Sequence, residues 1–128
     1  PVEYIQDQTL RLHLYRRMAH IVTLSELEQL VEEFTDRFGK PVEQVENLFF
    51  QLRVKLLAAE AGLVSVSVES DQIVMRFPQL PNGIYARDLP PIGYQTRPGK
   101  NAYWMRFDST GLEWRDDLLQ VLNAIITA

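Results

Sequence analysis

Residues 32–41 contain the pattern in this chain that comes closest to a catalytic motif. Asp36-Arg37-Phe38-Gly39 has the form of the kinase Asp-Phe-Gly metal loop with an arginine inserted. That loop follows a strand, and it works with a glycine-rich phosphate loop and with a catalytic Asp and Asn upstream. The sequence contains none of these, so we interpret Phe38 and Gly39 as the end of a helix.

Two histidines have a spacing that invites comparison with a metal site. His13 and His20 lie seven residues apart, which places both on one face of a predicted helix, beside Arg16 and Arg17. Helical metal sites usually place neutral imidazoles four residues apart and add a carboxylate or a thiolate. Because two neighbouring arginines disfavour a cation, we interpret this face as a solvated basic surface and expect neither a metal nor a cofactor.

Carboxylates in the first half of the chain are numerous enough to contain an acid/base pair. They are Glu26, Glu28, Glu32, Glu33, Asp36, Glu43 and Glu46. Most lie on the polar sides of two predicted helices, so a solvated surface explains them. Neither a nucleophile elbow nor a Ser/His/Asp set can be assembled from the spacing, and Pro98-Gly99-Lys100 predicts a hairpin turn because it lacks the other residues of a phosphate loop. We therefore expect that the chain is not an enzyme, and a small enzyme with an unrecognised site stays open as an alternative.

Residues 94–107 form the strongest candidate for nucleic-acid binding. This predicted hairpin interleaves aromatic rings with cations: Tyr94, Arg97, Lys100, Tyr103, Trp104 and Arg106. A surface of that kind could stack the bases of a single strand. Strand alternation, however, sends Trp104 to one face of the hairpin and Tyr103 to the other, and at least one face must be core. Structural packing therefore stays open beside nucleic-acid binding.

The spacing of apolar residues predicts three helices in the first half of the chain. They are expected at residues 6–22, 24–38 and 41–61. Thr23-Leu24-Ser25-Glu26 has the form of a capping box at the start of the second helix, and Pro41 suits the first turn of the third. Arg11 falls inside the apolar stripe of the first helix. Because an unpaired charge is costly to bury, we expect Arg11 to form a structural ion pair with a neighbouring element.

The apolar period changes from 3.6 to 2 after residue 62, which indicates β-strands. The strands are expected at residues 64–68, 73–77, 94–97 and 102–107. They form two antiparallel hairpins, joined by a proline-rich connection over residues 78–91 with at most one helical turn. A second capping box, Thr110-Gly111-Leu112-Glu113, starts a last helix. Three helices, a sheet of two hairpins and a C-terminal helix predict an α+β fold.

Composition restricts the class of protein. With 128 residues and 46% hydrophobic content, the chain should form a single domain over residues 1–128. A net charge of −4 gives no global attraction to nucleic acid or anionic lipid, and the lack of cysteine excludes disulfides and zinc knuckles. The absence of a long apolar run leads us to expect a cytoplasmic protein without membrane contact. Because the chain begins at Pro1, we expect it to be excised from a larger protein.

Four short motifs occur in a fixed order along the first half of the chain. They are Tyr4-Ile5, Leu10-Arg11-Leu12-x-Leu14-Tyr15-Arg16-Arg17, Glu33-x-x-Asp36-Arg37-Phe38-Gly39-x-Pro41 and Val45-x-Asn47-Leu48. As an ordered set they resemble the C-terminal domain of the bacterial transcription-repair coupling factors, the Mfd family. The resemblance covers the whole chain and is strongest over residues 4–62. The connection of residues 78–91 departs from it, since the family has a short helix there.

The resemblance implies that the parent protein is an ATP-dependent DNA translocase that removes stalled RNA polymerase and recruits excision-repair proteins. In the family, this domain is regulatory and not catalytic. It packs against the N-terminal UvrB-like module of the same protein and masks the surface that recruits UvrA until stalled polymerase is engaged. UvrA, RNA polymerase and DNA are then indirect partners of the domain.

The resemblance also implies which residues make the interdomain contact. The family motif Glu-x-x-Asp-Arg places it at Glu33, Asp36 and Arg37. On a helix these residues face away from the apolar stripe, and charges of mixed sign suit a contact that can be undone. An ordinary solvated helix face, or an internal ion pair between Arg11 and Asp36, stays open as an alternative.

Overall fold

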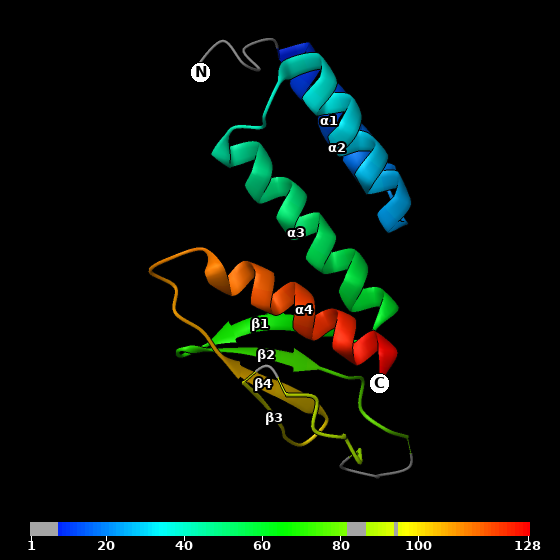
Figure 1. The fold of residues 1–128 in the computed structure, drawn as a ribbon. Coiled ribbons are helices and arrows are strands. Elements are labelled where there is room, and N and C mark those ends of the chain that lie inside the picture. Colours follow the sequence, from blue (N-terminus) through cyan, green and yellow to red (C-terminus); the bar gives the residue numbers. More distant parts are fainter. Residues whose placement is uncertain (1–7, 82–86, 94) are drawn as a thin grey trace. The chain divides into compact units, whose positions relative to one another are not determined.

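The computed structural model describes residues 8–81, 87–93 and 95–128 (Figure 1). Tyr4, Ile5, Tyr94 and the middle of the proline-rich connection lie outside these residues. The chain divides into two compact units, residues 1–56 and residues 57–128, and the boundary falls inside the third helix.

Three helices make up the described part of the first unit. They are α1 (Gln8–His20), α2 (Leu24–Phe38) and α3 (Glu43–Glu60), of which α3 continues past the unit boundary. The N-cap half of the capping box predicted for α2 is present, because the Thr23 hydroxyl accepts from the Glu26 amide at 3.1 Å. The Glu26 carboxylate accepts from the Thr23 hydroxyl at 3.0 Å, in place of the backbone amide that a full capping box uses. α2 ends where predicted, at Gly39, whose φ of 81° is strained for any residue with a side chain.

The core of the first unit is built from apolar side chains of all three helices. Its buried members are Leu14, Leu27, Leu30, Phe34, Val45 and Phe49. The Phe34 ring connects two of these helices, because its centroid lies 5.7 Å from that of Phe49 in an edge-to-face arrangement. The ring also lies 4.9 Å from that of Phe38 one turn further along α2. The apolar stripe predicted for α2 is therefore the side that is buried.

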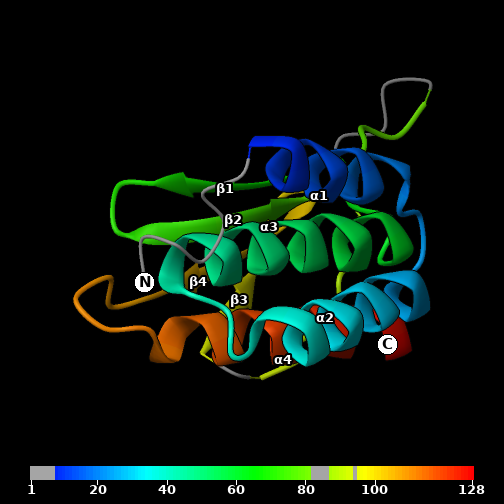
Figure 2. The same cartoon turned by 90° about the horizontal axis from the view of Figure 1, so that it is seen from above.

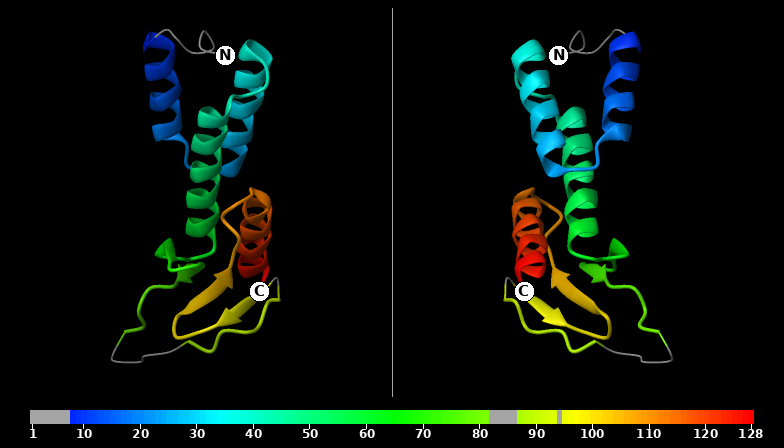
Figure 3. Two further views of the ribbon diagram at one scale, coloured as in Figure 1. Left: turned by 90° about the vertical axis from the view of Figure 1, so that its left-hand side faces the viewer. Right: turned by 90° about the vertical axis from the view of Figure 1, so that its right-hand side faces the viewer.

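The stripe predicted for α1 is wider than the face that α1 buries. Tyr15 is 47% exposed and Val22 is 75% exposed, although both belong to the apolar spacing that predicts a helix at residues 6–22. Arg11 is exposed as well, and none of the described residues forms an ion pair with it. Figure 3 shows α1 and α2 diverging from the turn that joins them, so the first turns of α1 reach into solvent. A hydrated Arg11 needs no partner, which removes the reason for expecting one.

The second unit contains a four-stranded antiparallel sheet. Its strands are β1 (Ser65–Glu69), β2 (Gln72–Arg76), β3 (Thr96–Pro98) and β4 (Ala102–Arg106). They are arranged in the order β1-β2-β4-β3, so the two predicted hairpins join through β2 and β4. In that central pair Met75 lies opposite Tyr103 and Val74 lies opposite Trp104. The fold is therefore α+β, as predicted.

One face of the sheet is covered by α4 (Glu113–Thr127), as Figures 1 and 3 show. The helix buries Leu118, Val121, Leu122 and Ile125. The capping box predicted at Thr110 is wrong. The Thr110 hydroxyl donates to the Asp108 carboxylate at 2.6 Å, and α4 begins after Leu112 without a side-chain cap. Asp108, two residues upstream, accepts this hydrogen bond in a local turn, so the Thr110 hydroxyl does not cap α4.

The described ends of the proline-rich connection contain no helix and are fastened to the sheet. The Arg87 amide donates to the Asn101 side-chain oxygen at 2.9 Å, and the Arg87 guanidinium donates to the Pro78 carbonyl at 3.0 Å. Further along, the Tyr103 hydroxyl donates to the Pro90 carbonyl at 2.6 Å. Side chains of β4 and its turn therefore hold this segment.

We predict that Leu27→Ala destabilises the protein by about 2–5 kcal/mol, because it leaves a cavity in the core of the first unit. Leu27 is 0% exposed, whereas Leu12 on α1 is 52% exposed. The matched variant Leu12→Ala should change the free energy of unfolding by less than about 0.5 kcal/mol. Urea titrations of both variants measure the difference, and equal effects would contradict this core.

We also predict a pH dependence that originates in Tyr103. Burial raises the pKa of the Tyr103 hydroxyl, so the unfolded chain ionises at a lower pH than the folded protein does. The resulting stability is complete below about pH 10 and is lost as the pH rises through the folded-state pKa. The free energy of unfolding should therefore fall across this range, and Tyr103→Phe should reduce the fall.

Tyr15 provides the control for that measurement because its side chain is 47% exposed. Urea titrations of Tyr15→Phe at each pH should reproduce the alkaline loss of stability seen in the unmodified chain. If Tyr103→Phe reproduced it equally well, the burial of Tyr103 would not be its cause.

Candidate interaction surfaces

A shallow groove of about 120 Å³ lies between α1 and α2 in the first unit. Its apolar lining comes from Leu14, Leu30, Phe34 and Phe38, and its polar lining comes from His13, Arg17, Glu33 and Arg37. The groove brings Glu33 and Arg37, two of the three residues predicted for the interdomain contact, to the side of α2 that faces α1. Charged groups therefore border an apolar hollow, which is an arrangement that suits contact with another protein.

Glu33 is held by a partner within its own unit. The Arg17 guanidinium of α1 donates to the Glu33 carboxylate, and this hydrogen bond holds the pKa of Glu33 below its usual value. Both side chains are at least half exposed, so the ion pair adds little to stability. It does fix the position of the carboxylate at the edge of the groove. Sequence spacing could not predict this pair, since it depends on how α1 crosses α2.

Arg37 lies over an aromatic ring of its own helix. The centre of its guanidinium is 5.3 Å from the centroid of the Phe38 ring, a cation–π geometry. The Arg37 side chain remains exposed beside this ring. Its N–H groups can therefore donate to a carboxylate of another protein.

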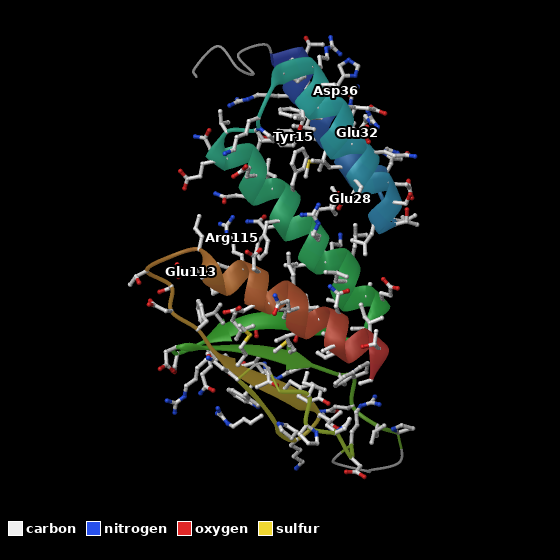
Figure 4. All side chains as sticks on the ribbon, viewed as in Figure 1. Tyr15, Glu28, Glu32, Asp36, Glu113 and Arg115 are labelled. Atoms are coloured by element: carbon white, nitrogen blue, oxygen red, sulfur yellow. The ribbon has the colours of Figure 1, made fainter. Side chains whose placement is uncertain are left out.

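Asp36 lies on the outer face of α2, away from the groove. Figure 4 marks Glu28, Glu32 and Asp36 one turn apart along the helix, where like charges repel one another. Glu28 forms an ion pair with Arg53 of α3 at 2.5 Å. For Glu32 and Asp36, the described part of the chain provides no ion pair. The three predicted residues thus occupy two adjoining faces of α2, with Asp36 on the outer one.

The two histidines predicted to lie on a basic face do so. His13 and His20 are exposed beside Arg16 and Arg17, and together they line an open hollow of about 320 Å³. One ring nitrogen of His20, Nδ1, lies 2.7 Å from the Arg16 carbonyl oxygen. Within the described residues, no three His, Cys, Asp or Glu side chains are grouped closely enough to hold a metal ion.

The residues predicted for nucleic-acid binding are divided by the sheet. Tyr103 is 1% exposed and lies in the core, so it is not part of any binding surface. Trp104 points to the opposite face, directly across from Arg97 on β3. Lys100 in the turn and Arg106 are exposed. Of the six predicted residues, Arg97, Lys100, Trp104 and Arg106 therefore remain candidates, Tyr103 does not, and Tyr94 lies outside the described residues.

Arg76 joins this surface, although the sequence analysis did not include it. The centres of the Arg76 and Arg97 guanidiniums each lie 5.8 Å from the centroid of the Trp104 ring. Arg76 also forms an ion pair with Glu69 on β1, which raises the pKa of Arg76 and lowers that of Glu69. Arg76 and Val74 lie two residues apart on β2, so strand alternation places them on the same face. Alternation alone could not show that this face adjoins Trp104, because the pairing of β2 with β4 is not evident from the sequence.

None of the helices among the described residues is long and apolar enough to cross a membrane.

Comparisons with known proteins agree with the motifs of the first half. A family model described as the TRCF domain matches residues 1–86. The transcription-repair-coupling factor of Rickettsia prowazekii is 31% identical over 60% of this chain and 7% of its own length. That of Mycobacterium tuberculosis is 34% identical over 68% of this chain and 7% of its own length. This chain therefore spans only a small part of these relatives.

A solved structure extends the likeness to the whole chain. The crystal structure of the C-terminal domain of a transcription-repair coupling factor matches with a TM-score of 0.71, covering 99% of this chain and 85% of that chain. At 19% sequence identity, this match shows a shared fold. The resemblance that the sequence motifs indicated is confirmed. The chain belongs to the TRCF domain family and is a domain of a transcription-repair coupling factor.

Proposed function

We propose that this domain is a regulatory, non-catalytic clamp that packs on the N-terminal UvrB-like module of its own coupling factor. In the closed state it masks the surface that recruits UvrA, and it is released when the parent engages stalled RNA polymerase. The parent is an ATP-dependent DNA translocase of the bacterial cytoplasm, and its motor lies in other domains. RNA polymerase, UvrA and DNA are indirect partners of this chain, and the whole of residues 1–128 acts as one domain in this role.

The observation that carries the proposal is the exposure of the Glu-x-x-Asp-Arg segment on one rigid helix. Glu33, Asp36 and Arg37 are all exposed, and the buried Leu27, Leu30 and Phe34 anchor the other side of the helix. A partner can therefore meet these charges without unfolding any part of α2. The match of the TRCF domain model to residues 1–86, a range that includes this segment, supports the same assignment.

The charges suit a contact that must later be broken. Arg17 holds Glu33 in place before the partner arrives, so less side-chain freedom is lost on binding. Asp36 offers a carboxylate to a cation of the partner, and Arg37 offers N–H donors to an acid. Exposed ion pairs of this kind add specificity and are individually weak, so the interface stays releasable.

A weak contact is sufficient because both modules belong to one protein. Linkage within a chain gives an effective concentration of about 1 mM for the partner. A Kd of about 100 µM between the separated modules would then keep about nine molecules in ten closed. A modest change at the interface can therefore release the UvrA-recruiting surface.

We predict that Asp36→Lys and Arg37→Glu each weaken binding to the isolated UvrB-like module by about tenfold, because each places a like charge against the partner. Isothermal titration calorimetry with both proteins at high concentration measures the affinity. Glu60→Lys is the matched control, because Glu60 is also an exposed acid but lies outside the first unit. Circular dichroism of each variant checks that it remains folded.

Unchanged affinity in the Asp36 and Arg37 variants, or no binding of the folded wild-type pair, would contradict the proposed clamp.

The masking of the UvrA-recruiting surface is tested separately by competition. The wild-type chain should reduce the capture of UvrA by the UvrB-like module, and Asp36→Lys should restore it. If the chain bound the UvrB-like module without reducing the capture of UvrA, the contact would exist but the proposed masking of UvrA recruitment would be wrong.

A further inference from the structure

The sheet of the second unit presents a basic surface on the face opposite α4. We name it the basic face: Arg76, Arg97, Lys100 and Arg106, arranged around Trp104. Cross-strand pairing places Trp104 opposite both Val74 and Arg97, and Arg106 opposite Gln72, so these side chains share one side of the sheet. Tyr103 and Met105, which alternate with them, are buried on the other side. Nothing in the proposed clamp uses this surface.

We propose that the basic face binds the phosphate backbone of duplex nucleic acid. Guanidinium groups match phosphate oxygens with paired N–H donors, and they are the preferred protein group for that purpose. Here three arginines from three adjacent strands, β2, β3 and β4, point the same way beside an exposed lysine. The arrangement can meet several phosphates along one backbone.

Trp104 contacts two of the guanidiniums and holds them in position. Arg76 and Arg97 each lie 5.8 Å from the ring centroid, so cation–π attraction orients both before any ligand arrives. The indole itself rests against the turn at Gly99, where a side-chain carbon would come within 2.9 Å of the indole nitrogen. Glycine in the turn therefore permits this position of the ring.

The geometry favours a duplex over a single strand. Binding of single strands depends largely on bases that stack on exposed aromatic rings. The Trp104 ring already has two guanidinium partners, and Tyr103 is buried. What remains on the surface is positive charge, and a duplex concentrates phosphate more densely than a single strand does, at one charge per about 1.7 Å of axis.

Charges in the second unit are segregated in a way that supports this inference. Glu113, Asp116 and Asp117 lie on α4, on the other side of the sheet. Figure 4 marks Glu113 near one end of this helix, which Figure 2 shows from above. On the basic face, Glu69 of β1 pairs with Arg76, so part of the charge of Arg76 is already balanced. Asp71, in the turn between β1 and β2, lies near the end that carries Arg106. The cationic centre is therefore nearer Arg97 and Lys100.

We predict that the chain binds a fluorescein-labelled 20-base-pair DNA duplex in low salt, with an affinity that falls as salt rises. With three or four phosphates contacted, the plot of log K against log salt should have a slope of about −3 to −4. Arg97→Glu should lower the affinity by about tenfold or more and make the slope shallower by about one. Fluorescence anisotropy measures both.

Lys55→Glu is the matched control, since Lys55 is exposed and the net charge changes by the same amount. It should leave the affinity and the slope nearly unchanged. The single strand of the same length should bind more weakly than the duplex. Tighter binding of the single strand, equal effects of the two charge reversals, or no binding in low salt would each overturn the proposal.

Glu69→Gln provides a test that a folding defect cannot imitate. Removing the acid frees Arg76 from its ion pair and should tighten duplex binding about threefold, with a steeper salt slope. An unchanged or weaker affinity would show that Arg76 does not contact the backbone. Arg97 and Glu69 lie in the second unit, so the outcome at these two positions is independent of the Asp36 and Arg37 contact.

Discussion

The burial of Phe34 is the packing constraint on which the first unit depends. This ring sits edge-to-face against Phe49 of α3, and the rings of α2 continue to Phe38, while Leu27 and Leu30 fill the preceding turns. With that side of α2 fixed inward, helical geometry leaves Asp36 outward and Glu33 and Arg37 at the groove with α1. The position of every charge in the candidate contact therefore follows from apolar packing.

The elements were predictable where a local rule decided them. The stripe of α2, the hydroxyl of Thr23 and the positive φ of Gly39 each depend on residues within a few positions of one another. Thr110 shows the limit of such a rule, because a competing local bond to Asp108 removed the expected cap. The prediction that the whole apolar stripe of α1 is buried was wrong for a different reason. Periodicity gives the direction of an apolar face, but it does not give how much of that face a neighbouring helix covers.

The candidate surfaces depended more on tertiary contacts and were predicted less completely. Spacing along α2 grouped three charges, but it could not show that Arg17 of α1 holds Glu33. In the sheet, strand alternation correctly placed Trp104 and Tyr103 on opposite faces. The contact between Arg76 and Trp104 could not be predicted without knowing that β2 pairs with β4. Contacts between elements that are distant in sequence are set by crossing angles and strand order, which a single sequence does not specify.

The central claim is that α2 forms the releasable contact with the UvrB-like module. The most direct test is an NMR titration of the isotopically labelled chain with the unlabelled module, which locates the contact residue by residue. Our account predicts that amide shifts change at Glu33, Asp36 and Arg37 and on α1 near Arg17, and that β1 to β4 are undisturbed. Changes confined to the sheet and α4, or no change at saturating concentrations of the folded module, would contradict it.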